Sequence, residues 1–159
     1  MQGKNVSYLK GYSMKIKSTI EITCSPEEIF SWIDDPDKAM CWQKNVKSGE
    51  IIIETAERIG TTFKEEIEED GKRLIIFGEI TGYIQNKSIS FHLKSKIHKV
   101  NVKYSVEGNT KLTKVTVDSI IKWKFPMNIV CLCIGTKIKN NISHKTRSEL
   151  GELKVLCET

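Results

Sequence analysis

The sequence has 159 residues, of which 39% are hydrophobic and 28% are charged, and it carries a formal net charge of +5. This length suits a single domain with a sizeable core, and the composition excludes a disordered or collagen-like chain. The longest apolar run, 129–134, is far shorter than the ~20 residues that cross a bilayer. Because the first residues also lack the apolar segment of an export signal, we expect a cytoplasmic protein.

The 5 cysteines support a cytoplasmic location, because their odd number and irregular spacings do not form a disulfide framework. Cys131 and Cys133 are closer together than a zinc-binding pair, and no second pair or histidine accompanies them. The sequence therefore predicts that the cysteines are free thiols and that the chain holds neither a metal ion nor a cofactor.

The chain is expected to begin with an extension. Met1–Ser13 shows no sustained periodicity, which predicts a disordered segment of these 13 residues. The pattern changes at Met14, which is a candidate start of the natural chain. A single domain is predicted over 14–159.

A strand and two short helices come first. Residues 16–24 alternate apolar and polar side chains, the period of a half-buried strand. Ser25 then precedes Pro26, the pattern of a capped helix start. Asp35 is the expected cap of a second short helix.

Six strands follow in quick succession. They are predicted over 46–54, 61–69, 72–84, 88–93, 99–106 and 110–124 from alternating side chains and intervening turns. The strongest hairpin signal is Asp70-Gly71. Gly78 and Gly82 lie inside a strand, where glycine is typical of a bend, so we expect the sheet to curl there.

A long helix is predicted over 127–155. Its apolar stripe contains Cys131, Ile134, Ile138, Ile142, Leu150, Leu153 and Cys157. The stripe weakens between Ser143 and Glu149, so either a continuous or a kinked helix fits that stretch.

Together these elements predict an α+β fold. Hairpin turns join nearly all strands, so six or seven antiparallel strands form one sheet, which twists and curls around the C-terminal helix. Two short helices separate the first strand from the second. One helix does not fill a strongly curved sheet, so large side chains or a cavity must occupy the space.

Side chains on the inner face are candidates for lining such a cavity. They are Phe30, Trp42, Phe63, Glu65, Phe91, Tyr104, Val117, Ser119, Ile121, Trp123, Ile134 and Ile138. The alternative is that they simply fill the core. Glu65 has its own alternative, in which a bulge turns it outward among the neighbouring glutamates.

The segment from Met14 onward resembles the START-like, or Bet v 1-like, helix-grip superfamily, and especially its polyketide cyclase/dehydrase and lipid-transport (SRPBCC) branch. Local motifs in order carry the resemblance: 25–33, Asp34-Asp35-Pro36 with Trp42, Gly60-Thr61-Thr62-Phe63, and 78–83 followed by 88–91. The resemblance implies a helix-grip fold. It does not define the function, because this fold hosts binding proteins, transfer proteins and enzymes.

Three functions remain open. The first is binding or carrying a small hydrophobic molecule, such as a lipid, isoprenoid or polyketide, between the sheet and the C-terminal helix. The second is a cyclase/dehydrase-type enzyme with Glu65 and Tyr104 as candidates for proton transfer; no catalytic set is otherwise evident. The third is a protein-interaction module.

Charge is divided between two blocks. Residues 50–82 carry 9 acidic and 4 basic side chains, whereas 87–147 carry 2 acidic and 13 basic ones. The basic region Lys87–Lys124 is either a solvated face or a docking surface for an anionic membrane or an acidic protein. It lacks interleaved aromatic residues, which argues against nucleic acid. The sequence gives no oligomeric state.

Overall fold

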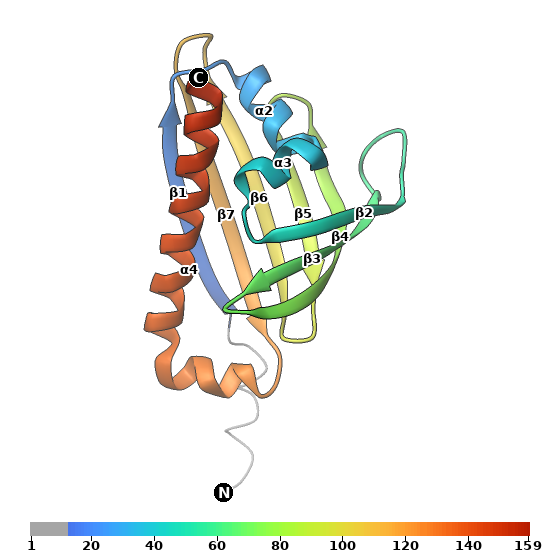
Figure 1. Cartoon of the computed structure of the whole chain (residues 1–159), viewed down its shortest axis with the longest axis vertical. Coiled ribbons are helices and arrows are strands. Elements are labelled where there is room, and N and C mark those ends of the chain that lie inside the picture. Colours follow the sequence, from blue (N-terminus) through green and yellow to red (C-terminus); the bar gives the residue numbers. More distant parts are fainter. Residues whose placement is uncertain (1–12) are drawn as a thin grey trace, which may run out of the picture.

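The computed structural model describes residues 13–159, and one antiparallel sheet dominates it (Figure 1). Its strands are β1 (Ser13–Ile22), β2 (Val46–Ile53), β3 (Thr62–Glu69), β4 (Lys72–Ile84), β5 (Ser88–Lys94), β6 (His98–Gly108) and β7 (Thr113–Trp123). They pair in the order β1-β7-β6-β5-β4-β3-β2. The predicted curved sheet is confirmed with seven strands. Of the predicted extension, residues 1–12 lie outside the described part, and Ser13 already belongs to β1.

Two short helices, α2 (Pro26–Asp34) and α3 (Pro36–Trp42), connect β1 to β2 as predicted. The Ser25 hydroxyl accepts a hydrogen bond from the Glu28 backbone N–H, and the Asp35 carboxylate accepts from the first residues of α3. These side chains satisfy N–H groups that lack a partner within each helix. Both helices lie over the inner face of the sheet, with α2 packed against β6 (Figure 1).

The C-terminal helix α4 (Met127–Glu158) bends once. Ile134 has non-helical backbone angles, and the helix is regular through 143–149, where the sequence left a kink open. Gly135, which directly follows the bend, weakens the helix there. Figure 1 shows the first turns of α4 crossing the end of the sheet and the rest running alongside β1.

The core lies where the second part of α4 packs on the sheet and on α2. Its most deeply buried side chains include Ile22, Ile29, Val115, Leu150 and Leu153. A smaller cluster of Met14, Ile16 and Ile121 lies near the bend of α4, with Ile138 and Ile142 packed on it. These contacts fill the β1–β7 side of the sheet.

Gly151→Ala in α4 is expected to stabilise the protein by about 0.5–1 kcal/mol, because alanine restricts the unfolded chain and favours the helix. An added Cβ at this position meets no heavy atom within 4 Å. Urea denaturation measures the change.

The matched control is Gly78→Ala in β4. Here an added Cβ would lie 2.1 Å from Cζ of Phe63, so overpacking is expected to cost about 1–3 kcal/mol. A loss of stability in Gly151→Ala would show that space around α4 is tighter than described.

Candidate functional site

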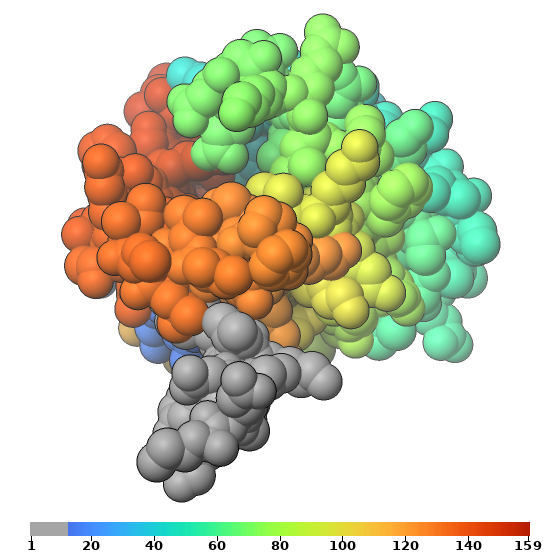
Figure 2. Space-filling view, turned by 90° about the horizontal axis from the view of Figure 1, so that it is seen from below, coloured from blue at the N-terminus to red at the C-terminus, as the bar shows by residue number. Residues whose placement is uncertain are grey.

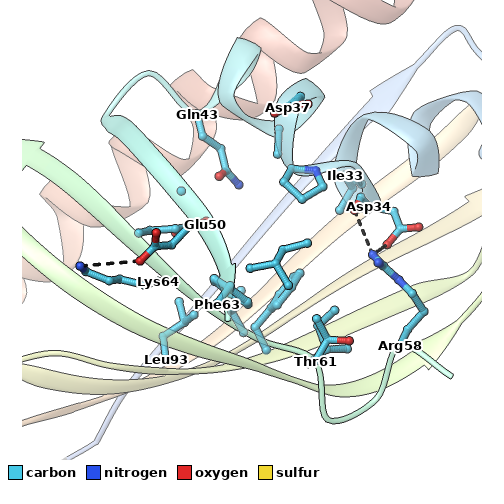
Figure 3. Close-up of a pocket in the computed structure, with 18 of the residues that line it drawn as sticks. Ile33, Asp34, Asp37, Gln43, Glu50, Arg58, Thr61, Phe63, Lys64 and Leu93 are labelled. Carbon is cyan, nitrogen blue, oxygen red and sulfur yellow. Dashed lines mark hydrogen bonds and ion pairs between the residues drawn. The ribbon is translucent and has the colours of Figure 1, made fainter. Parts of the chain in front are cut away.

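A cavity of about 370 Å³ lies between strands β3–β6 and the helices α2 and α3, with β2 forming one wall (Figure 3). Its apolar lining includes Ile33, Phe63, Ile80, Phe91, Leu93 and Val102. This volume lies in the range of sites for small molecules. The sequence placed the cavity between the sheet and the C-terminal helix, but α4 contributes no lining residue.

An aromatic row forms the floor of the cavity. Phe63 meets Phe91 edge to face with ring centroids 5.8 Å apart, and Phe91 meets Tyr104 at 6.3 Å. Phe63 lies over Gly78, its cross-strand partner, whose missing side chain leaves room for the ring. The absence of a side chain at Gly78 thus leaves space for the Phe63 ring on the inner face of the sheet.

Glu65 lines this apolar cavity. The β3–β4 register runs without a bulge through Glu65 and Ile76, so Glu65 keeps the same face as Phe63, two residues earlier. Burial raises its pKa above that of an exposed glutamate. The side chain therefore accepts a proton more readily than an exposed carboxylate does.

Tyr104 supplies a second polar group to the wall. Burial raises its pKa, and the negative charges of Glu149 and Glu65 raise it further, while the Gln43 side chain acts in the opposite direction. The phenol therefore stays protonated at neutral pH. Glu65 and Tyr104 place an acceptor and a donor in the same cavity.

A half-buried ion pair closes one side of the cavity. The Arg58 guanidinium pairs with the Asp34 carboxylate and donates to the Asp34 backbone oxygen at 3.1 Å. The Tyr83 hydroxyl donates to the other Asp34 oxygen at 3.0 Å, and Arg58 lies 5.5 Å from the Tyr83 ring centre. These contacts tie the end of α2 to the β2–β3 loop and to β4.

A looser ion pair stands across the cavity from the first. Lys64 Nζ lies 3.9 Å from the Glu50 carboxylate, and both side chains are largely exposed. Figure 3 shows this pair and the Arg58–Asp34 pair at opposite sides of the apolar floor. Exposed pairs of this kind contribute little stability, so this pair holds the Glu50 side of the cavity only weakly.

The residues predicted from the sequence divide into two groups. Phe63, Glu65, Phe91 and Tyr104 line the cavity. The others do not line it. Three are buried in the core, namely Phe30, Trp42 and Val117, and Ile121 is buried in the smaller cluster. Three are half-buried, namely Ser119, Trp123 and Ile138, and Ile134 is 48% exposed. The β7 and α4 residues lie elsewhere because α4 packs directly against that side of the sheet.

Sequence reasoning missed the Asp34–Arg58–Tyr83 group. From the sequence, Asp34 was assigned only to the Asp34-Asp35-Pro36 motif, and Arg58 lies in a loop where no periodicity places a side chain. Arg58 also has a positive φ of 70°, which is unusual for a residue with a Cβ. A lone arginine directly after Glu57 in a loop was the available signal.

A serine–histidine contact outside the cavity has a structural role. Ser95 Oγ lies 2.8 Å from His98 Nδ1 and accepts hydrogen bonds from the backbone N–H groups of Ile97 and His98. It therefore stabilises the β5–β6 turn. Within residues 13–159, no three histidine, cysteine, aspartate or glutamate side chains gather to hold a metal ion.

Known proteins match this chain in structure, though not in sequence. No protein-family profile matches the sequence, and no curated protein does. A START superfamily protein from Mycobacterium smegmatis superposes with a TM-score of 0.77 at 18% identity, covering 91% of this chain and 97% of that one.

Two further solved structures are similar to this chain. ZhuI aromatase/cyclase from Streptomyces sp. R1128 gives a TM-score of 0.70 at 9% identity, with coverage of 90% and 94%. Major latex-like protein 151 from Panax ginseng gives a TM-score of 0.67 at 11% identity, covering 94% of this chain and 100% of that one. At these identities the likeness establishes the fold alone. The chain has the START-like helix-grip fold, which confirms the fold implied by the sequence resemblance.

Glu65→Gln is expected to be more stable than the wild type at pH 8, with the advantage vanishing near pH 4. The raised pKa of Glu65 means that the folded protein disfavours the ionised carboxylate. Glu65 therefore lowers the stability of the wild type as the pH rises from the pKa of glutamate in the unfolded chain to its higher pKa in the folded chain. Urea denaturation across this pH range tests the prediction. The exposed Glu79→Gln is the control, and equal pH profiles for both variants would contradict it.

Proposed function

We propose that this protein binds or carries a small hydrophobic molecule, such as a lipid, isoprenoid or polyketide, in the cavity beneath α2 and α3. The observation that carries the proposal is an apolar cavity of about 370 Å³ with Glu65 and Tyr104 in its wall. A well-filled core would have favoured the protein-interaction alternative instead. Structural likeness to a START superfamily protein and to an aromatase/cyclase supports the proposal.

The binding energy comes from apolar surface. Each Å² of ligand surface removed from water contributes about 25 cal/mol before the costs of association. The aromatic floor supplies a preformed contact surface for a flat or branched apolar group. Tyr104 donates and Glu65 accepts, so a ligand with one hydroxyl or carbonyl group is oriented by them.

Titration with the apolar fluorophore 1-anilinonaphthalene-8-sulfonate tests for such a site. A preformed cavity predicts saturable binding with one probe molecule per chain and a blue-shifted emission. A free fatty acid or a polycyclic phenol added afterwards is expected to displace the probe. Weak, non-saturating fluorescence that no apolar competitor reduces would contradict the proposal.

Proton-transfer catalysis is the second candidate function. Glu65 faces the cavity, and burial raises its pKa, which brings a carboxyl group closer to the range of a general acid or base. Tyr104 is the candidate donor to a developing oxyanion. For a polyketide substrate, Glu65→Gln is expected to abolish turnover while retaining substrate binding. Unchanged turnover removes this candidate.

The cytoplasm remains our proposed location. All 5 cysteines are free thiols, and Cys24, Cys131 and Cys157 are buried. Burial, with the charge of nearby groups, raises the pKa of Cys157 to about 12, so this thiol stays protonated and unreactive. In residues 13–159, none of the helices is long and apolar enough to span a bilayer.

A further inference from the structure

The first turns of α4 expose apolar side chains, which is unusual for a helix on the surface of a domain. The apolar corner comprises four residues of α4, Ile129, Val130, Leu132 and Ile134, together with Phe125 just before the helix. These side chains are between 39% and 76% exposed. Only Cys131 in this stretch is buried. A helix that packs on a sheet normally buries its apolar residues and exposes polar ones. Here the outward side is apolar, so it is suited to contact something other than water.

Basic residues surround the apolar corner. The stretch 119–148 contains Lys122, Lys124, Lys137, Lys139, Lys145 and Arg147 and no acidic residue. Residues 127–134 themselves carry no charge. An uncharged apolar segment flanked by lysines combines apolar surface with positive charge, the two contributions that bind a protein to an anionic membrane interface.

A row of lysines crosses the sheet at the same end. Lys94 pairs directly with Lys99 across β5–β6, and Lys99 pairs with Lys122 across β6–β7. Like charges at directly opposed positions destabilise a sheet. A negatively charged surface that binds the row would remove this repulsion.

The corner and the lysine row lie at the same end of the molecule. The Lys124 backbone N–H donates to the Ile97 carbonyl at 2.8 Å, which holds the β5–β6 turn beside the start of α4. In Figure 2, seen from below, the orange start of α4 and the yellow β5–β6 turn lie next to each other. The acidic β3–β4 turn, in green, is seen in the same view, and its Glu69 carboxylate lies 3.4 Å from Lys145 Nζ of α4.

We propose that the apolar corner and the lysine row dock this protein on an anionic phospholipid bilayer. The helix segment lies flat, with its five apolar side chains at the boundary of headgroups and acyl chains and the lysines on the lipid phosphates. The corner lies in a stretch, 119–148, that has basic residues and no acidic one, which favours an anionic lipid surface as its partner. The proposal does not depend on what the cavity binds.

Sedimentation with lipid vesicles tests the docking. The full chain is expected to bind vesicles of 70% phosphatidylcholine and 30% phosphatidylglycerol at least tenfold better than pure phosphatidylcholine. Binding is expected to fall as NaCl rises from 50 to 500 mM. Failure to bind either vesicle would overturn the proposal.

Two variants separate the apolar and electrostatic contributions. Phe125→Ser with Leu132→Ser is expected to weaken binding to anionic vesicles at least tenfold, and Lys99→Glu with Lys122→Glu is expected to abolish the preference for anionic lipid. The exposed Ile59→Ser, in the β2–β3 loop, is the matched control and is expected to bind as the wild type does. Circular dichroism and probe binding in the cavity establish that each variant is folded.

Two results would overturn the proposal even if vesicles are bound. One is binding that is unaffected by the Phe125→Ser/Leu132→Ser change, since the corner would then play no part. The other is a stable dimer in light scattering that this double change converts to monomer, since the corner would then be covered by a second copy.

Discussion

Val102→Trp is expected to reduce binding of 1-anilinonaphthalene-8-sulfonate at least tenfold, a loss of about 1.4 kcal/mol or more. Val102 lies on β6 opposite Phe91, and both side chains line the cavity. An indole at this position projects into space that the ligand must occupy. The variant keeps its fold because the cavity accepts the added volume without displacing the core.

Lys103→Trp is the matched control for that substitution. Lys103 is the next residue of β6 and is exposed on the opposite face of the sheet. The Lys103→Trp substitution adds the same indole outside the cavity and is expected to leave probe binding unchanged. Equal losses in both variants, or none in Val102→Trp, would show that the probe binds elsewhere.

Trp42→Ala is expected to lower the free energy of unfolding by about 3–5 kcal/mol. Trp42 is 1% exposed, its Nε1 donates to the Trp32 carbonyl at 2.9 Å, and its ring meets Tyr104 edge to face at 6.0 Å. Alanine leaves a large void behind the cavity wall and an unpaired carbonyl. Thermal unfolding is expected to shift down by about 6–20 °C for a domain of this size.

Trp32→Ala is the control for the loss of a tryptophan. Trp32 is only half-buried, with the Lys38 ammonium 5.5 Å from its ring centre. Its removal is expected to cost clearly less than that of Trp42. A similar or larger cost would mean that Trp42 is not the side chain that anchors α3 to the sheet.

Most of the fold was predictable because its signals are local. Alternating side chains located each strand, and Ser25 and Asp35 marked both short helices before any tertiary contact was known. The bend of α4 was not located. The apolar stripe weakens at 143–149, yet packing on β1 keeps that part helical, whereas the uncharged segment before Gly135 turns away at Ile134.

The site was predictable only in part, because it depends on which half of the sheet α4 covers. Strand parity correctly indicates which face Glu65 and Phe63 share, and the continuous β3–β4 register preserves it. Parity does not show that α4 packs over β1 and β7, which removes Val117 and Ile121 from any cavity. Nor does it reveal the Asp34–Arg58 pair, which forms between segments 24 residues apart through a loop.

Native mass spectrometry of the gently isolated chain tests the central claim most directly. We predict a population that carries one small apolar molecule per chain, released on denaturation and recovered in an organic extract. Val102→Trp, isolated in the same way, is expected to lack that added mass, while Lys103→Trp retains it. An added mass that persists in Val102→Trp, or a wild-type chain that neither carries nor takes up any apolar molecule, would contradict the account.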